Sequence, residues 1–325
     1  MKQLRWQGAL IGLLLVVAAC GPSDGGATTT DSVTVDQGTD LTFHMITHSD
    51  DGVFWSVVKR GAEDAGKALG VTVVWNPSVN TPEKQVTDIE AAIAADSDGM
   101  GVSLAAPEAV GPAVVKAVAA GIPVITVNSG SNQYKELGAI THVGQTEIVA
   151  GEGAGERFNA LGAKHVLCAR QEQTNIGLEE RCTGLENTFG GDVTSEFIGL
   201  DTDPTAQEAQ IAALLQADST IDAVLGTGPN VAVRAVAAGT TAGRTLIIGG
   251  FDISDDIVGQ IEAKAIAFTV DQQQYVQGYL PIVLLYLNNV NLNTVGGGLP
   301  VLTGPGFVDT ENVSAVKALV QAGTR

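Results

Sequence analysis

Short apolar runs alternate with amphipathic helical patterns along most of this chain. Such runs predict buried strands, and apolar residues that recur at three- and four-residue steps between them predict helices. The predicted strands are 41–47, 71–75, 99–104, 122–127, 139–143, 165–169, 193–200, 221–225, 246–249 and 266–270. Strands that alternate with helices indicate parallel sheets with helices on both faces. We therefore expect an α/β protein of two similar doubly wound lobes, each built from about five βα units.

The length and charge of the chain restrict its partners. Its 325 residues, 45% of them hydrophobic, suffice for two domains of ordinary size. Residues 1–19 contain Lys2 and Arg5 but no acid, so their removal changes the net charge from -19 to -21. A surface this acidic repels nucleic acids and anionic lipids, and DNA binding is excluded as a function.

The first residues carry the features of a secretion signal. Residues 1–19 have a positive start and an apolar stretch too short to span a bilayer, which predicts a signal peptide. Val17-Ala18-Ala19-Cys20-Gly21 resembles the bacterial lipobox, in which Cys20 is lipidated and becomes the mature N-terminus; the alternative is an ordinary signal peptide with an incidental cysteine. Residues 20–39 are rich in Gly, Ser, Thr and Asp and predict a flexible tether. We expect an extracytoplasmic protein held at a membrane by a lipid anchor.

Two cysteines remain after Cys20. Because the predicted compartment is oxidising, a disulfide between Cys168 and Cys182 is expected, although a catalytic cysteine is an alternative. Two cysteines without a CxxC pair or neighbouring histidines do not form a metal site. No metal is therefore expected.

Hydrogen-bonding side chains follow nearly every predicted strand. In open α/β sheets, ligands bind at the carboxyl ends of the strands. The residues at these ends are His48, Ser49, Asn128, Ser129, Gln145, Thr227, Asn230, Asp252 and Gln272. Any one of them alone could be a helix cap or a turn residue. Their coincidence across the strands predicts a site, and neutral amides with single carboxylates suit a small, uncharged, polyhydroxylated ligand.

Phe54 and Trp55 begin the helix that follows the first strand. An indole beside a polar loop can stack on the apolar face of a sugar ring, although packing in the core is the alternative for both residues.

Motifs for catalysis are missing from the sequence. It contains no GxxxxGK[ST] phosphate loop, no GxSxG elbow and no HExxH metal motif, and its four histidines are scattered. We therefore expect neither an enzyme nor a cofactor. A sugar-acting hydrolase or isomerase is the less favoured alternative.

Four segments, in this order behind a lipobox, resemble a known family. They are Phe54-Trp55-Ser56-Val57-Val58-Lys59-Arg60-Gly61, Gly121-Ile122-Pro123-Val124-Ile125-Thr126, Gly250-Phe251-Asp252 and Thr269-Val270-Asp271-Gln272-Gln273. Over about residues 40 to 300 the chain resembles the type I periplasmic substrate-binding proteins of bacterial ABC importers, of the ribose- and galactose-binding kind. The resemblance implies a sugar or sugar-like polyol captured between two lobes, an ABC permease as partner, and a monomer.

The resemblance also implies that the chain crosses between the lobes three times, near residues 145, 272 and 300. Residues 40–145 with 273–300 would form the N-terminal lobe. Residues 146–272 with 301–325 would form the C-terminal lobe.

Residue roles follow where the motifs match. Phe54 and Trp55 take the place of paired aromatics that sandwich the sugar ring. Asp252 takes the place of a carboxylate that accepts hydrogen bonds from sugar hydroxyls. Gln272 takes the place of an amide near the hinge that also contacts the ligand.

Two positions depart from the family pattern. Asn128 and Ser129 stand where many sugar binders have Asp-Arg, which argues against ribose or galactose itself. In the second lobe an arginine commonly reaches the ligand, and Arg181 or, by a shifted alignment, Glu179 takes that place. The alternative functions are a receptor for a furanosyl signalling molecule and an input to a sensor kinase. A sugar-responsive repressor shares the lobes, but here a lipobox stands where the DNA-binding headpiece would be.

Overall fold

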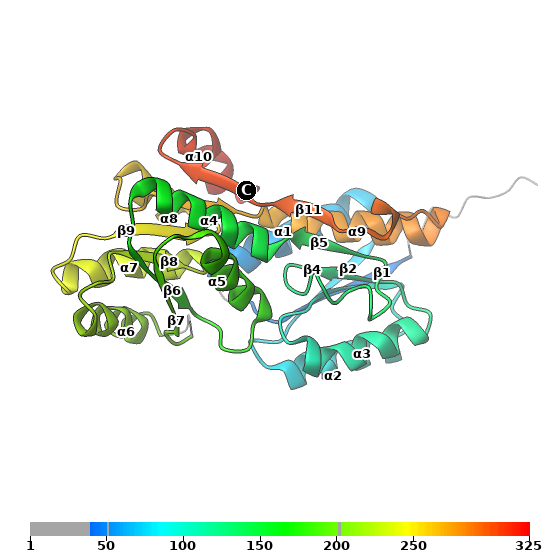
Figure 1. The fold of residues 1–325 in the computed structure, drawn as a ribbon. Coiled ribbons are helices and arrows are strands. Elements are labelled where there is room, and N and C mark those ends of the chain that lie inside the picture. The colour runs from blue at the N-terminus through cyan, green and yellow to red at the C-terminus, as the bar shows by residue number, and fades with distance from the viewer. Residues whose placement is uncertain (1–39, 51, 201–202) are drawn as a thin grey trace, which may run out of the picture. The chain divides into compact units, whose positions relative to one another are not determined.

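The computed structural model describes residues 40–50, 52–200 and 203–325. The predicted signal peptide, the tether and Cys20 lie outside these ranges. Within them the strands form two six-stranded sheets (Figure 1). The first contains β1 (Thr42–Thr47), β2 (Thr72–Pro77), β3 (Gly99–Ser103), β4 (Val124–Val127), β5 (Thr141–Gln145) and β11 (Val301–Gly304). The second contains β6 (His165–Arg170), β7 (Asp192–Phe197), β8 (Ala223–Gly226), β9 (Ile247–Phe251), β10 (Phe268–Asp271) and β12 (Gly306–Asp309).

The two sheets have matching strand orders, β11-β5-β4-β3-β1-β2 and β12-β10-β9-β8-β6-β7. In the described residues every pairing is parallel except that of β12 with β10, which is antiparallel. The structure therefore confirms the predicted pair of doubly wound α/β lobes.

Helices cover the sheets. α1 (Gly52–Leu69), α2 (Pro82–Ala94), α3 (Pro107–Ala119) and α9 (Gln274–Asn291) pack with the first sheet and form the first lobe with it. The second lobe holds α4 (Glu147–Leu161), α5 (Ile176–Thr188), α6 (Pro204–Ala217), α7 (Pro229–Thr241), α8 (Asp255–Glu262) and α10 (Val313–Gln321). Among the residues described, no helix is both long and apolar enough to cross a bilayer.

The last crossing between the lobes lies later than expected. Residues 301–304 pair in parallel with β5 of the first sheet, whereas residues 306–309 pair with β10 of the second sheet. The chain therefore changes lobe at Pro305 and not near residue 300, so the assignment of 301–304 to the C-terminal lobe is corrected.

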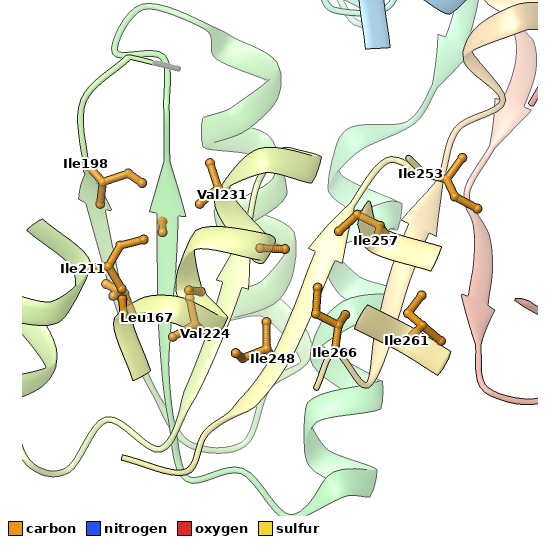
Figure 2. Packing of buried hydrophobic residues seen from close by; sticks show 14 of the residues in the cluster. Leu167, Ile198, Ile211, Val224, Val231, Ile248, Ile253, Ile257, Ile261 and Ile266 are labelled. Carbon is orange, nitrogen blue, oxygen red and sulfur yellow. The ribbon is translucent and has the colours of Figure 1, made fainter. Parts of the chain in front are cut away.

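The core lies on both faces of each sheet. Figure 2 shows one such face in the second lobe, where Leu167, Val224 and Ile248 on neighbouring strands lie under Val231 of α7 and Ile257 of α8. Separate clusters fill the opposite face of this sheet and both faces of the first sheet. Burial on both faces explains why central strands such as β4 and β8 are apolar runs without alternation.

Glycines allow two helix pairs to pack closely. A Cβ at Gly278 of α9 would lie 1.8 Å from the carbonyl oxygen of Val58 in α1, and one at Gly184 of α5 would lie 2.1 Å from that of Ile148 in α4. Figure 1 shows α1 beside α9 and α4 beside α5. These contacts fix the position of α1, which carries the aromatic pair, and of α5, which carries Arg181.

A disulfide joins Cys168 of β6 to Cys182 of α5, with the two Cα atoms 5.9 Å apart. The predicted disulfide is confirmed, and the alternative of a catalytic cysteine is withdrawn. The bond ties the start of the second sheet to the helix that carries Arg181.

Candidate ligand-binding site

A small cavity of about 50 Å³ lies where strand ends of the two sheets meet. All but three of the predicted binding residues line the wall of this cavity. The residues that line it are His48, Ser49, Phe54, Trp55, Asn128, Arg181, Asn230, Asp252 and Gln272.

The other three predicted residues lie behind the wall. Ser129 Oγ is 3.0 Å from Asn128 Oδ1, and Gln145 Nε2 donates to Glu147 Oε2 at 2.9 Å. Thr227, which is fully buried, hydrogen-bonds with its neighbours in the second lobe. These side chains position residues of the wall and do not line the cavity themselves.

The aromatic side chains in the cavity wall meet edge to face and form a corner. Trp55 is only 4% exposed, and its ring meets those of His48 and Phe54 edge to face, with centroids 4.9 and 5.0 Å apart. The planes of the Phe54 and Trp55 rings are at 86° to each other. The expected sandwich therefore cannot form between these two rings, and Trp55 can only offer one face or edge to a ligand.

Asp252 has no ion-pair partner among the described residues. It follows β9 in the left-handed conformation, with φ of 69°, and its side chain is buried. Gln272 Nε2 donates to Asp252 Oδ1 at 2.6 Å. Burial raises the pKa of Asp252 to about 7, although Arg181 and the hydrogen bond from Gln272 act in the opposite direction. This carboxylate is held in place with an oxygen available to hydroxyl donors.

An amide links Asp252 to the other lobe. Gln272 Oε1 accepts a hydrogen bond from Asn128 Nδ2 at 3.3 Å and another from Gln277 Nε2 at 2.8 Å. Asn128, Gln272 and Asp252 thus form a chain from the first lobe through the crossing at β10 to the second lobe.

The charge of Arg181 is neutralised inside the protein. Its Nε and Nη2 atoms donate to both oxygens of Glu147 at 2.7 and 3.0 Å, and Nη1 donates to the carbonyl of Thr227 at 2.6 Å. Its guanidinium lies 4.4 Å from the ring centre of Phe251. Burial alone would lower the pKa of Arg181, but Glu147 more than offsets this and the pKa lies above its ordinary value. Arg181 is thus held in a fixed position in the cavity wall, and its charge is already paired with that of Glu147.

The segment between β6 and α5 adds residues that the sequence reasoning missed. Glu172 Oε2 lies 3.4 Å from His48 Nε2, and Asn175 Nδ2 donates to the same carboxylate oxygen at 2.7 Å. Burial would raise the pKa of Glu172, but His48 and Asn175 hold it below its ordinary value. The cavity is also lined by Gly52, Val53, Asn80, Gln171, Leu178 and Pro229. Glu172 and Asn175 follow a predicted strand, so the strand-end rule would have found them had it been applied to β6.

Comparison with known proteins gives one consistent result. A family model described as periplasmic binding protein domain matches residues 43–288. The xylose/arabinose-binding protein XylF of Sulfolobus acidocaldarius is 26% identical over 83% of this chain and 71% of its own length. The ribose import binding protein RbsB of Bacillus subtilis is 27% identical over 70% of this chain and 74% of its own length. A solved carbohydrate transporter from Acidothermus cellulolyticus 11B in complex with myo-inositol is 40% identical, with a TM-score of 0.85, over 88% of this chain and 100% of that one.

Proposed function

The chain belongs to the periplasmic binding protein family, and on this premise we propose that it binds a small neutral polyol for an ABC permease. The ligand would be a monosaccharide or a cyclitol such as an inositol, held in the cavity between the lobes. The myo-inositol complex of the Acidothermus cellulolyticus protein, at 40% identity, supports a cyclitol. The family consists of binding proteins, and we propose no catalytic activity for this chain.

The proposal rests on how the charged side chains around the cavity are paired with one another. Arg181 and Glu147 satisfy each other, and Glu172 pairs with His48. Among the described residues of the wall, Asp252 is the carboxylate without an ion-pair partner, and it lies next to neutral amides. A hydroxyl can donate to the carboxylate and accept from an amide, so vicinal hydroxyls on a ring match this set. An anionic ligand would find no unpaired arginine or lysine among the described residues of the wall.

The departure from the family pattern at residues 128–129 narrows the class of ligand. Ser129 lies 3.0 Å from Asn175 Oδ1, and Asn128 contacts Gln272, so this loop presents an amide and no charge. Because many sugar binders of the family have Asp-Arg here, the departure argues against ribose or galactose itself. The myo-inositol complex of the Acidothermus cellulolyticus protein favours an inositol.

Closure around the ligand would use contacts that already join the lobes. Residues 48 and 128–129 of the first lobe contact residues 172 and 175 of the second lobe and Gln272 of the crossing. A ligand that contacts both lobes favours the closed arrangement by its difference in affinity for the two states.

We further propose that Cys20 is lipidated and that residues 20–39 tether the body to the outer face of a membrane, as a monomer. Replacing Cys20 with serine should move the protein from the membrane to the soluble fraction. Equal membrane association of the variant and the parent would contradict the anchor.

A thermal-shift screen of the body from residue 36 onward tests the ligand class. Inositols, pentoses, hexoses, linear polyols, sugar phosphates and amino acids would be added after unfolding and refolding have removed any bound ligand. An inositol at 100 times its Kd should stabilise the protein by about 2.7 kcal/mol. The variant Trp55→Ala should lose the shift while keeping a cooperative transition. A shift with sugar phosphates or amino acids, and with no polyol, would refute the proposal.

A further inference from the structure

A long stretch near the end of the chain carries no charge. Between Asp271 and Asp309 the sequence contains no Asp, Glu, Lys, Arg or His, although 16% of all residues are charged. The first part of this stretch is α9, whose packing against α1 explains its apolar residues. Burial does not explain the part that follows, because residues 291–297 and Leu299 are exposed. We term residues 292–299 the apolar tip.

The apolar tip exposes three large apolar side chains. Leu292 is 84% exposed, Leu299 61% and Val295 41%. Single exposed leucines are ordinary on protein surfaces. Several of them in one short loop that is otherwise rich in Gly and Asn are typical of an interaction site.

Leu292 occupies a backbone position that does not favour leucine. It follows the last residue of α9 in the left-handed conformation, with φ of 53°, and its N–H donates to the carbonyl of Asn288 at 3.0 Å. Helices usually have Gly or Asn at such a position, because a bulkier side chain strains this conformation. Neither the backbone nor the core therefore accounts for a leucine here, and its apolar side chain indicates a role at the surface.

Hydrogen bonds hold the far end of the apolar tip to the first lobe. The hydroxyl of Tyr134 donates to the carbonyl of Gly298 at 2.7 Å, and that of Thr141 donates to the carbonyl of Leu299 at 2.8 Å. Within the tip, the N–H of Leu299 donates to the carbonyl of Gly296 at 2.9 Å. The apolar side chains are therefore presented on a loop whose backbone is fixed at both ends.

The apolar tip lies beside the place where the predicted tether joins the body. Near the end of α9, Asn289 Nδ2 donates to the carbonyl of Asp98 at 2.9 Å, and Asp98 Oδ2 accepts from the N–H of Thr42 at 2.7 Å. Asn289 precedes Leu292 by less than one helical turn. Figure 1 shows the orange end of α9 at the outer end of the first lobe, away from the second lobe. The start of β1 and the apolar tip thus share one end of the first lobe.

The predicted tether would keep this end of the first lobe close to a membrane. A flexible chain as long as residues 20–39 has a root-mean-square end-to-end distance of about 25 Å. A lipid on Cys20 would therefore hold Thr42 and the apolar tip within roughly that distance of the bilayer. The bilayer is then always within reach of the tip, whereas a second copy of the chain would have to meet it by diffusion.

Charge favours the apolar tip over other parts of the surface as the contact with a bilayer. The loss of Lys2 and Arg5 with the signal peptide takes the net charge from -19 to -21, and such a protein is repelled by anionic lipids. The tip itself carries no charge, so its side chains meet no such repulsion of their own. Leucine and valine side chains can be buried at the boundary between headgroups and acyl chains.

We propose that the apolar tip inserts into the surface of the bilayer that holds the lipid anchor, so that the first lobe rests on the membrane. This inference depends on the proposed anchor at Cys20. Because α9 runs from the crossing at β10 to the tip, contact at the tip fixes the first lobe as a whole. Closure around a ligand would then be a movement of the second lobe relative to a first lobe held at the membrane.

Quenching of a fluorophore by lipid tests this contact. The mature lipidated protein is reconstituted into phosphatidylcholine vesicles that contain a spin-labelled lipid. An environment-sensitive fluorophore is attached at Asn293→Cys in the tip or, as the control, at Ala318→Cys beside Leu319, which is 47% exposed in the second lobe. Quenching should be several-fold stronger at residue 293 than at residue 318.

A variant of the apolar tip tests which side chains make the contact. The tip variant combines Leu292→Asn, Val295→Ser and Leu299→Ser. It should reduce quenching at residue 293 to the level seen at residue 318. The matched control makes the same changes at side chains of the second lobe that are each 47% exposed, namely Leu319→Asn, Val149→Ser and Leu161→Ser, and it should leave this quenching unchanged. Both variants should melt and bind polyol like the parent, because the replaced side chains are exposed and lie outside the cavity.

The composition of the vesicles separates apolar contact from attraction by charge. Phosphatidylglycerol should weaken quenching at residue 293 at low salt, because the acidic body is repelled, and added salt should restore it. Quenching that increases with phosphatidylglycerol would overturn the inference.

The remaining outcomes separate the tip from the anchor. A parent protein that does not sediment with vesicles refutes the lipid anchor and, with it, the contact at the tip. Sedimentation with equal quenching at residues 293 and 318 overturns the contact at the tip alone. Fluorescence at residue 293 that changes with protein concentration in the absence of vesicles would identify a second copy of the chain as the partner and would also overturn it.

Discussion

Replacing Asp252 with asparagine should stabilise the ligand-free protein above neutral pH and weaken ligand binding. Burial raises the pKa of Asp252 to about 7 from an ordinary value of 3.8. At 1.36 kcal/mol per unit, this difference corresponds to about 4 kcal/mol. Because the folded state holds the proton more tightly than the unfolded chain, the free energy of unfolding falls as the pH rises from about 4 to about 7. Asparagine is nearly isosteric, can still accept from Gln272 and removes this pH-dependent loss.

Urea unfolding at pH 5 and pH 8 measures the effect. Between these pH values the free energy of unfolding of the wild type should fall, relative to that of Asp252→Asn, by a large part of the 4 kcal/mol. The comparison isolates Asp252 because every other group titrates in both proteins. Hydroxyl donors stabilise the charged carboxylate, so polyol binding should lower the pKa of Asp252 and release a proton near pH 7, which calorimetry in two buffers detects. The variant should bind polyol about 10- to 100-fold more weakly, as expected for the loss of a charged hydrogen bond. Identical pH dependence of unfolding in both proteins would refute the reasoning.

Three further variants test other parts of the structure. Glu147→Gln leaves Arg181 buried without its anionic partner and should lower the free energy of unfolding in urea by about 3–5 kcal/mol. Adding Arg181→Met to this variant should recover much of the loss. Equal stability of the wild type, the single variant and the double variant would contradict the pairing. Cys168→Ser removes a disulfide that closes a loop of about 15 residues and should cost about 3 kcal/mol, which calorimetry should also find for the wild type under reduction. Gly278→Ala should cost 1–3 kcal/mol or more, since its Cβ would lie 1.8 Å from a carbonyl oxygen of α1. The control Gly259→Ala adds a Cβ with nothing within 4 Å and should be neutral or mildly stabilising.

Burial and length together decide which strands can be predicted from the sequence. Strands such as 99–103 and 124–127 are buried at every residue and were predicted. The six-residue edge strands β2 and β7 have no fully buried residue and were still predicted. The edge strands 301–304 and 306–309 have only four residues and are each buried at a single one, and they were not predicted. Their absence from the prediction also displaced the last crossing between the lobes.

Hydrogen-bond partners decide which strand-end residues reach the cavity. Position along the chain places Asn128 and Ser129 equally at the end of β4, yet Asn128 lines the cavity and Ser129 contacts Asn175 behind it. That difference depends on a partner in the other lobe, far away in sequence. Glu172 also follows a strand, β6, but its contact with His48 of the other lobe cannot be inferred from its position along the chain.

The buried carboxylates suggest how ligand capture could be linked to closure. Glu147 pairs with Arg181 and Glu172 contacts His48, whereas Asp252, which lines the cavity, has no ion-pair partner in the described part of the chain. In an open form water would hydrate this carboxylate, whereas the closed and empty form must hold it buried, which is unfavourable above pH 7. A polyol that donates a hydroxyl to Asp252 removes part of this cost in the closed form only. The same residue would then provide both recognition of the ligand and the difference in affinity that drives closure.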